Sequence, residues 1–268
     1  MRFFNLLLTF LLFTPSLGQT TVSALFAEVD RHFPDSLEKG VQLIEAFTLD
    51  ELNIQQRKQF HDKASIFYSS IGNFSKEVYH LEQLTLLHTD QDSVHHVRQF
   101  LALAQLNSGD LNGSLETAKS SARHYAARNN LAGLGSAYNG MGNALQNLGY
   151  GDEAIEAFNR AISINEFLDR PEFVCKGYGN LAISYRIIGN MEKHFECCKK
   201  AYDIAIELQD TSEIMFYQMA YGSAFNTLNQ PDSAIYYLEP LQNYFQTNFN
   251  AQILNAIYND LGQAYSTL

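Results

Sequence analysis

Cysteine is scarce in this chain of 268 residues, which has only Cys175, Cys197 and Cys198. An exported domain held by disulfides normally carries more cysteines, in even number. A bridge between the adjacent Cys197 and Cys198 would be strained, and one from Cys175 would need two helices to approach at a suitable distance. We therefore predict three buried thiols that pack as small apolar side chains, in a fold stabilised by its core.

Basic residues are also few. Lys and Arg total 18 against 29 Asp and Glu, so the formal net charge is −11. This charge would repel phosphate backbones and anionic lipid surfaces, and nucleic acid is not an expected partner. Proline is rare as well, with five residues, whereas 46% of residues are hydrophobic and 18% are charged. This composition predicts a packed chain and excludes disorder over most of its length.

Long apolar runs are missing apart from one at the start. The run from Phe3 to Phe13 is shorter than the roughly 20 residues that a helix needs to span a bilayer. Ser16 and Gly18 suit the −3 and −1 positions of a signal peptidase site. We predict a signal peptide at residues 1–18, cleaved before Gln19, with an uncleaved anchor or a buried first helix as the alternative. The mature chain would be periplasmic or secreted, and no later segment is expected to insert into a membrane.

Signatures of catalysis and of metal binding are missing too. The sequence has no phosphate-binding P-loop, no G-x-S-x-G turn, no H-E-x-x-H helix and no paired C-x-x-C. Its eight histidines are scattered, and a metal site would need several of them to converge. A site built from His88, His95 or His124 is conceivable, and helix-lining histidines are the other interpretation. We predict no catalytic residue, no metal and no cofactor, so the chain is not expected to be an enzyme.

What the sequence does contain is a pattern that recurs every forty residues. Small residues align at this distance, and each is preceded by a large apolar residue. The aligned small residues are Ala102, Gly142, Ala182, Gly222 and Gly262. Seven residues later comes a column typical of turns, made of Gly109, Gly149, Gly189 and Asn229. A second amphipathic segment follows each turn, so the unit is a helix hairpin whose small residues allow close packing.

One unit carries a recognisable signature. The pattern Y-x-x-M-G-x-x-L, followed by G-Y-x-D-E-A-I-x-x-F-x-x-A, spans Tyr138 to Ala161 and resembles the tetratricopeptide repeat family. The next units depart from it at His194 and Leu241, where the family has small residues. The resemblance implies an all-α fold, a right-handed superhelical solenoid of antiparallel helix hairpins. The family's usual period is shorter, so a period of about 40 residues predicts longer helices or longer links between hairpins.

The repeat pattern also suggests how the chain is divided. Residues 19–50 read as a degenerate N-terminal helix hairpin, because atypical repeats often cap a stack. Residues 51–268 read as the tetratricopeptide repeat array. The segment Asn255 to Leu268 spells only the first helix of a further unit. From this we predict an array truncated at its C-terminal end.

The resemblance implies a partner-binding groove on the inner face of the first helices, where the family commonly holds a protein or an extended peptide. Asparagine and glutamine can donate and accept hydrogen bonds, so a row of them could bind a peptide backbone; solvated polar residues are the alternative. Asn143 matches the family's carboxylate-binding Asn, but Asn139 stands where a Lys is expected, so that clamp is not predicted. The groove candidates are Asn139, Asn143, Gln146, Asn147, Lys176, Ile183, Arg186, Phe216, Met219, Asn226, Asn259 and Gln263, with Ser136, Ile187 and Ser223 beside them.

Two functions fit these expectations. An export signal followed by such repeats is similar to the sensor region of bacterial signalling proteins, in which a transmembrane helix and a kinase or DNA-binding output follow. The first hypothesis is therefore a non-catalytic binding module that forms the sensor or interaction part of a larger signalling protein. The alternative is a free-standing envelope scaffold or adaptor for a multiprotein complex.

Overall fold

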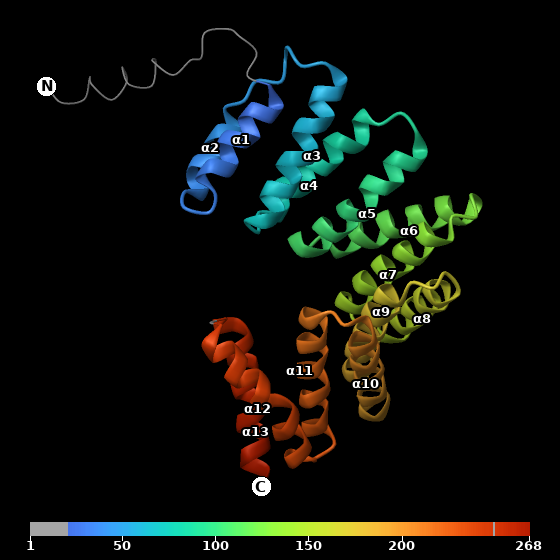
Figure 1. The fold of residues 1–268 in the computed structure, drawn as a ribbon. Helices are drawn as coiled ribbons and strands as arrows, with labels where there is room; N and C mark the ends of the chain where they lie inside the picture. Colours follow the sequence, from blue (N-terminus) through green and yellow to red (C-terminus); the bar gives the residue numbers. More distant parts are fainter. Residues whose placement is uncertain (1–20, 249) are drawn as a thin grey trace, which may run out of the picture. The chain divides into compact units, whose positions relative to one another are not determined.

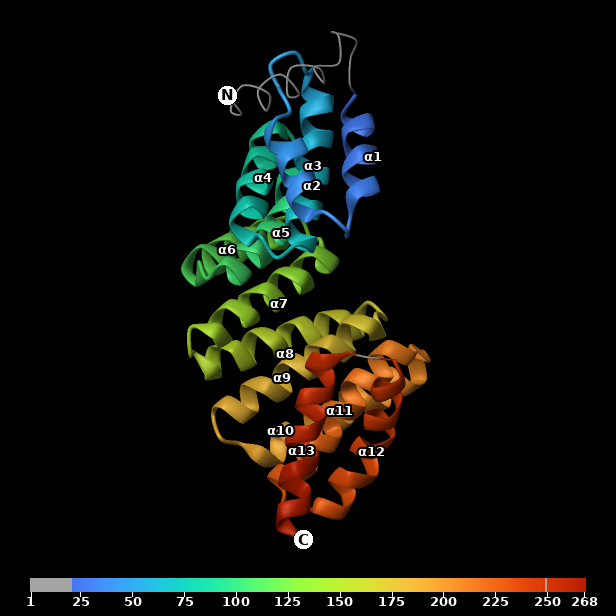
Figure 2. The same ribbon diagram turned by 90° about the vertical axis from the view of Figure 1, so that its left-hand side faces the viewer.

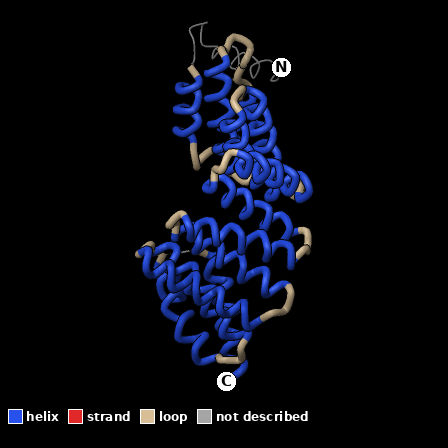
Figure 3. The backbone as a smooth tube through the Cα atoms, turned by 90° about the vertical axis from the view of Figure 1, so that its right-hand side faces the viewer, coloured by secondary structure: helices blue, strands red, loops and turns tan. Residues whose placement is uncertain are grey.

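A computed structural model describes residues 21–248 and 250–268, and every regular element in this part is a helix (Figures 1 and 3). The predicted signal peptide, residues 1–18, lies outside the described residues. The helices are α1 (Val22–His32), α2 (Leu37–Glu45), α3 (Ile54–Ser70), α4 (Phe74–Leu87), α5 (Gln91–Ser108), α6 (Leu111–Ala127), α7 (Leu131–Asn147), α8 (Gly151–Phe167), α9 (Pro171–Ile187), α10 (Met191–Leu208), α11 (Thr211–Thr227), α12 (Pro231–Thr247) and α13 (Ala251–Thr267).

The chain divides into two compact units, of which the first ends at Val94. In its described part, α1 packs against α2 and α3 packs against α4. Helix α3 begins with a capping box, in which the Asn53 and Gln56 side chains each accept a hydrogen bond from the other residue's backbone N–H, both at 3.0 Å. The core of this unit contains Val22, Leu25, Phe26, Val29, Ile44, Phe60, Ala64, Phe67 and Tyr68.

The second unit, residues 95–268, is a stack of hairpins in which α7 pairs with α8, α9 with α10 and α11 with α12 (Figure 2). Helix α6 packs on α7, α8 on α9, and α10 on α11, so each hairpin covers the next one. Helix α13 packs on α12 and α11. The fold is an all-α solenoid of antiparallel helix hairpins, which confirms the predicted fold class.

The forty-residue period has a simple structural cause. Helices α6 to α9 and α11 to α13 each contain 17 residues, and three-residue links join α6 through α9. A residue with positive φ recurs every 20 residues, at Gly109, Asn129, Gly149, Asp169, Gly189, Gln209 and Asn229. The links within and between hairpins are therefore alike, and helix length accounts for the long period.

The small-residue column allows the two helices of a hairpin to approach closely. A Cβ atom added to Gly142 would lie 2.5 Å from the Phe158 ring, and one on Gly222 would lie 3.0 Å from Leu238. Phe158 and Leu238 are completely buried. A Cβ on Gly262 would meet no heavy atom of the described chain within 4 Å. The hairpin packing inferred from the sequence is thus present at Gly142 and Gly222.

The three cysteines are free and buried, as predicted. The Cys175 thiol donates a hydrogen bond to the Ala201 carbonyl oxygen at 3.2 Å. Burial raises the pKa of Cys197 to about 11 and that of Cys198 to about 12, so both thiols are neutral at pH 7. Among the helices that the structure describes, none combines the length and apolar character needed to cross a membrane.

Candidate functional site

A hollow of about 250 Å³ lies on the first helices of three successive hairpins, α5, α7 and α9. Its apolar wall contains Phe100 and Leu103 from α5 and Phe173 from α9, which are 51%, 50% and 36% exposed. Exposed large apolar side chains that converge on a hollow are typical of interaction sites. The other lining residues are Gln99, Ala102, Leu106, Ser114, Gly135, Ser136, Asn139, Gly140, Asn143, Ala161, Asn165 and Lys176.

Helical spacing places these side chains on one face. Gln99, Leu103 and Leu106 stand at positions i, i+4 and i+7 of α5, and Ser136 and Asn143 are likewise seven residues apart on α7. Each helix starts at a defined residue: the Asn130 side chain caps α7, and Pro171 occupies the first turn of α9. The repeated hairpin brings the three faces side by side.

The hollow over α5, α7 and α9 is lined by some of the predicted groove residues. Asn139 and Asn143 of α7 line it together with Lys176 of α9. The remaining candidates lie outside it, further along the first helices. These are Gln146 and Asn147 on α7, Ile183 and Arg186 on α9, Phe216, Met219 and Asn226 on α11, and Asn259 and Gln263 on α13.

Several predicted groove amides form hydrogen bonds within the protein. Asn180 Nδ2 donates to Asn139 Oδ1 at 3.0 Å, and Ser184 Oγ donates to Gln146 Oε1 at 3.1 Å, so both pairs join α7 to α9. Asn226 Nδ2 on α11 donates to a backbone carbonyl oxygen of α13 at 2.9 Å. These amides therefore connect neighbouring first helices, a role that the sequence did not indicate.

The hollow differs electrostatically from the acidic chain around it. Among the described residues that line it, Lys176 is the only charged one. Its Nζ lies 3.7 Å from Glu213 Oε1, and the two side chains are 57% and 30% exposed, so the pair is weak. Asn165 of α8 also lines the hollow and is only 3% exposed. The hollow thus has an apolar wall, one cation and several amide side chains.

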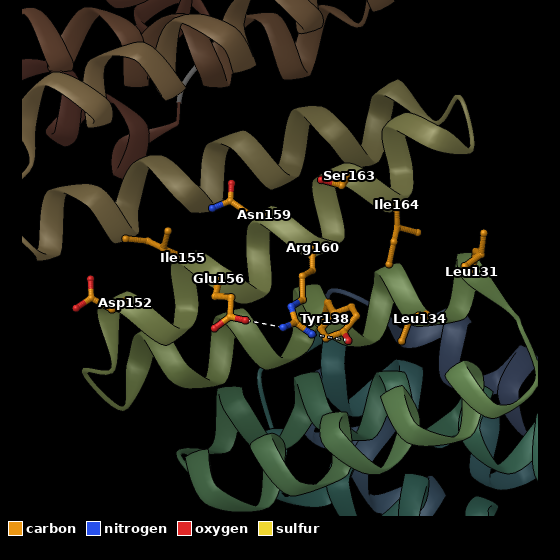
Figure 4. Close-up of a pocket in the computed structure, with 10 residues that line it drawn as sticks. All are labelled: Leu131, Leu134, Tyr138, Asp152, Ile155, Glu156, Asn159, Arg160, Ser163 and Ile164. Carbon is orange, nitrogen blue, oxygen red and sulfur yellow. Dashed lines mark hydrogen bonds and ion pairs between the residues drawn. The ribbon is translucent and has the colours of Figure 1, made fainter.

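A second hollow, of about 770 Å³, lies along the α7–α8 hairpin (Figure 4). Three of its polar side chains interact with one another: Arg160 bonds to Glu156 at 2.5 Å and to the Tyr138 hydroxyl at 3.2 Å, and its guanidinium lies over the Tyr138 ring. Tyr138, Ile155 and Ile164 also belong to the hairpin framework of this unit. This hollow offers a broad surface in which the charged groups of Arg160 and Glu156 are paired with each other.

The histidines do not converge on a metal site. Within the described residues, no group of three or more His, Cys, Asp or Glu side chains could hold a metal ion. The His95 and His124 rings stack with centroids 4.0 Å apart, and His95 Nδ1 lies 3.3 Å from Ser121 Oγ. These histidines therefore contribute to packing between α5 and α6.

Sequence reasoning missed the part of the hollow that α5 and Asn165 supply. The groove candidates began at Ser136 because the repeat signature is weak upstream of it. A signal was present: Leu103 precedes Asn143 by forty residues and therefore occupies the same column. Asn165 lies on a second helix, outside every groove column, so no repeat column indicates that it lines the hollow.

The fold is a tetratricopeptide-like solenoid of helical repeats. A tetratricopeptide repeat family model matches residues 135–167, which include the part of the hollow that α7 and α8 provide. No curated protein matches the chain.

Solved structures show the same fold at low sequence identity. A signal transduction ATPase with a tetratricopeptide repeat sensor, from Pyrococcus horikoshii, aligns with a TM-score of 0.70 and 16% identity over 90% of this chain but only 36% of its own. A Rap protein complexed with competence and sporulation factor aligns with a TM-score of 0.66 and 11% identity, over 91% of this chain and 74% of its own. A putative kinesin light chain from Podosopora anserina, with nearly identical repeats, aligns with a TM-score of 0.60 and 17% identity, over 74% of this chain and 99% of its own.

Proposed function

We propose that this chain is a non-catalytic module that binds a protein or an extended peptide on the first-helix face of its second unit. The observation that carries the proposal is the hollow over α5, α7 and α9, where Phe100, Leu103 and Phe173 are left partly exposed around polar groups. Apolar side chains that are exposed next to fixed hydrogen-bonding groups favour a ligand that is partly apolar and partly polar, as a peptide is.

The structural neighbours support this use of the fold. The Rap protein is in complex with competence and sporulation factor, and the Pyrococcus horikoshii protein has a tetratricopeptide repeat sensor. Because identities of 11% and 16% establish only a shared fold, they support the kind of function and not its partner.

A peptide-display screen tests the proposal. Residues 19–268 would be screened against random peptides, in parallel with the variants Leu103→Glu and Phe167→Glu. Leu103 lies in the hollow, whereas Phe167 is 78% exposed at the end of α8 and outside it, so it is a matched control for an added charge. We expect peptides that bind the unmodified chain and the Phe167 variant but not the Leu103 variant. Failure to select any peptide, or equal binding to both variants, would contradict the proposal.

The cellular role that we propose is the sensor part of an exported signalling protein. Its support is the signal-like run of residues 1–18 together with the sensor description of one neighbour. Fusion of residues 1–40 to a phosphatase that is active only after export tests the localisation. The coding region downstream of Leu268 tests the architecture: a transmembrane segment followed by a kinase or DNA-binding domain is expected, and a stop codon within one further helix would contradict the sensor role.

The envelope scaffold is the second candidate, and the broad hollow on the α7–α8 hairpin favours it. A scaffold would use this surface, so Asn159→Arg, an exposed change on α8, should abolish assembly with the partner while Leu103→Glu has no effect. The opposite result would favour the peptide-binding module.

A further inference from the structure

Helix α9 carries a row of side chains that extends beyond the hollow over α5, α7 and α9. At about 3.6 residues per turn, the members of this row fall within an arc of about 80°. They are Phe173, Lys176, Asn180, Ile183 and Ile187. Phe173 and Lys176 line the hollow. Ile183 and Ile187, which are 39% and 50% exposed, therefore continue the same face towards the C-terminal end of α9.

Contacts on both sides place the row between α7 and α11. Asn180 Nδ2 donates to Asn139 Oδ1 of α7 at 3.0 Å. On the other side, Lys176 Nζ lies 3.7 Å from Glu213 Oε1 of α11. The polar members of the row thus contact the neighbouring first helices, whereas its apolar members stay partly exposed in two groups. The near anchor is Phe173 with Phe100 and Leu103 of α5, and the far anchor is Ile183 with Ile187.

This surface is almost uncharged, although the net charge of the chain is −11. Asp, Glu, Lys and Arg number five in α8 and seven in α10, against none in α7 and three in α9. The single charge of the row, on Lys176, lies next to Glu213 of opposite sign. A charged partner segment would lose hydration here without meeting a complementary charge, so the surface fits an uncharged segment.

The spacing of the two anchors distinguishes an extended partner from a helical one. A rise of about 1.5 Å per residue places Ile183 about 15 Å and Ile187 about 21 Å from Phe173 along α9. In an extended segment, residues i and i+6 lie about 20 Å apart and on the same side. A helical segment would need residues i and i+11 to span a similar distance.

The polar centre of the row favours the extended form. A packed helix buries a continuous apolar stripe, and Lys176 and Asn180 interrupt such a stripe between the two anchors. An extended segment presents polar backbone groups between its anchoring side chains, and these can form hydrogen bonds with lysine and asparagine side chains.

We infer that the row on α9 binds an extended, uncharged peptide segment with large apolar residues at positions i and i+6, one at the near anchor and one at the far anchor. This inference rests on the proposed peptide-binding function and adds the sequence pattern of the ligand. Basic residues between the two apolar positions are disfavoured, because they would pass close to Lys176.

Three libraries of fluorescein-labelled 15-residue peptides test the spacing. Each library has two leucines, at positions 2 and 8, 2 and 5, or 2 and 13, and all other positions are drawn from Ala, Ser, Thr, Asn and Gln. Length and composition are therefore equal. Fluorescence anisotropy with residues 19–268 measures the affinity. We expect the 2-and-8 library to bind about tenfold more tightly than the other two, because only its leucines reach both anchors in an extended segment.

The variant Ile187→Glu assigns the preference to the far anchor. It should bring the 2-and-8 library to within about twofold of the 2-and-5 library, because a carboxylate no longer offers the second leucine an apolar contact. Ile206→Glu is the matched control, since Ile206 is 46% exposed on α10 and lines neither hollow. The spacing comparison on the unmodified chain needs no variant, so it decides the question even if Ile187→Glu does not fold.

The outcomes separate the inference from the function beneath it. Equal binding of the 2-and-8 and 2-and-5 libraries would overturn the two-anchor pattern, and tightest binding of the 2-and-13 library would overturn the extended form. A preference that survives in Ile187→Glu, or that Ile206→Glu removes equally, would overturn the assignment to the far anchor. If no library binds while the random-peptide screen still yields ligands that depend on Leu103, the inference fails alone; if that screen is empty too, the proposed function fails with it.

Discussion

The buried histidine pair of the first unit makes its stability depend on pH. His61 Nδ1 on α3 lies 2.9 Å from His80 Nδ1 on α4, and the residues are only 4% and 5% exposed. The Tyr68 ring stacks on His80 with centroids 5.3 Å apart. One Nδ1 donates and the other accepts, so the contact requires at least one neutral ring. The nearby charges of Arg57 and Lys76 oppose further protonation.

The sign and size of the effect follow from the pKa values. Burial is the main cause that lowers the pKa of His80 from 6.5 to about 4, and burial also lowers the pKa of His61. The unfolded chain therefore binds protons first, and the free energy of unfolding falls as the pH falls from 6.5 towards 4. At 1.36 kcal/mol per pKa unit, His80 alone contributes about 2 kcal/mol of this loss at pH 5 and at most about 3 kcal/mol in total.

One neighbour acts in the opposite direction. Burial raises the pKa of Glu77, so its carboxylate costs stability at neutral pH, and this cost disappears on acidification through the folded-state pKa. The net loss between pH 7 and pH 5 is therefore expected to be somewhat smaller than the histidine contribution alone.

Hydrogen exchange measured helix by helix at pH 7 and pH 5, corrected for the intrinsic rates, gives the required free energies of opening. We expect α3 and α4 to lose about 2 kcal/mol while α7 to α10 change much less. The double variant His61→Leu with His80→Leu should remove most of the pH dependence. An unchanged opening free energy in α3 and α4, or a His80 ring that titrates near 6.5 by NMR, would refute the reasoning.

Three further predictions concern the second unit. Gly142→Ala should lower the melting temperature, because the new Cβ would lie 2.5 Å from the Phe158 ring. Gly262→Ala, with open space around the new Cβ, should raise the free energy of unfolding by about 0.5–1 kcal/mol and hence the melting temperature. A shift of both melting temperatures in the same direction would contradict the packing. Phe158→Ala should cost about 3–5 kcal/mol in urea denaturation, and Phe167→Ala, at a side chain 78% exposed, should change little; equal losses would show that the burial is wrong. Cys198, whose pKa burial raises to about 12, should react with a disulfide reagent only in urea, and rapid labelling of the native chain would contradict this.

The repeat columns were enough to predict the hairpins, because each column reflects a packing requirement that recurs. Gly142 faces Phe158 and Gly222 faces Leu238, and both contacts restrict the allowed residues strongly. The sequence alone did not show that a turn recurs every 20 residues. The links between hairpins have Asn129, Asp169 and Gln209 at the positions where glycine would have indicated a turn. Asn and Asp can adopt the left-handed conformation but are also common elsewhere, so they indicate a turn less clearly than glycine does.

The groove was predicted only in part, for a different physical reason. Residues that face a groove are not restricted by the hairpin, so their identity does not show whether they bind a ligand or a neighbouring helix. Asn139 and Gln146 have the residue type expected for peptide binding, yet each accepts a hydrogen bond from α9. Asn165 lines the hollow from a second helix, outside every groove column, so its place beside the first helices is visible only in the three-dimensional structure.

The equal spacing of the turns has a consequence for how such a chain changes its length. Helices α7, α9 and α11 begin at residues 131, 171 and 211, and α7 and α9 are each reached through a link of three residues. Removal of residues 131–170 would join Asn130 to Pro171 and recreate a link of unchanged length before the next first helix. Whole hairpins can therefore be lost or duplicated by a single in-frame recombination, with no new turn to evolve. Each such event would shorten or lengthen, by one hairpin, the first-helix surface that is available to a ligand.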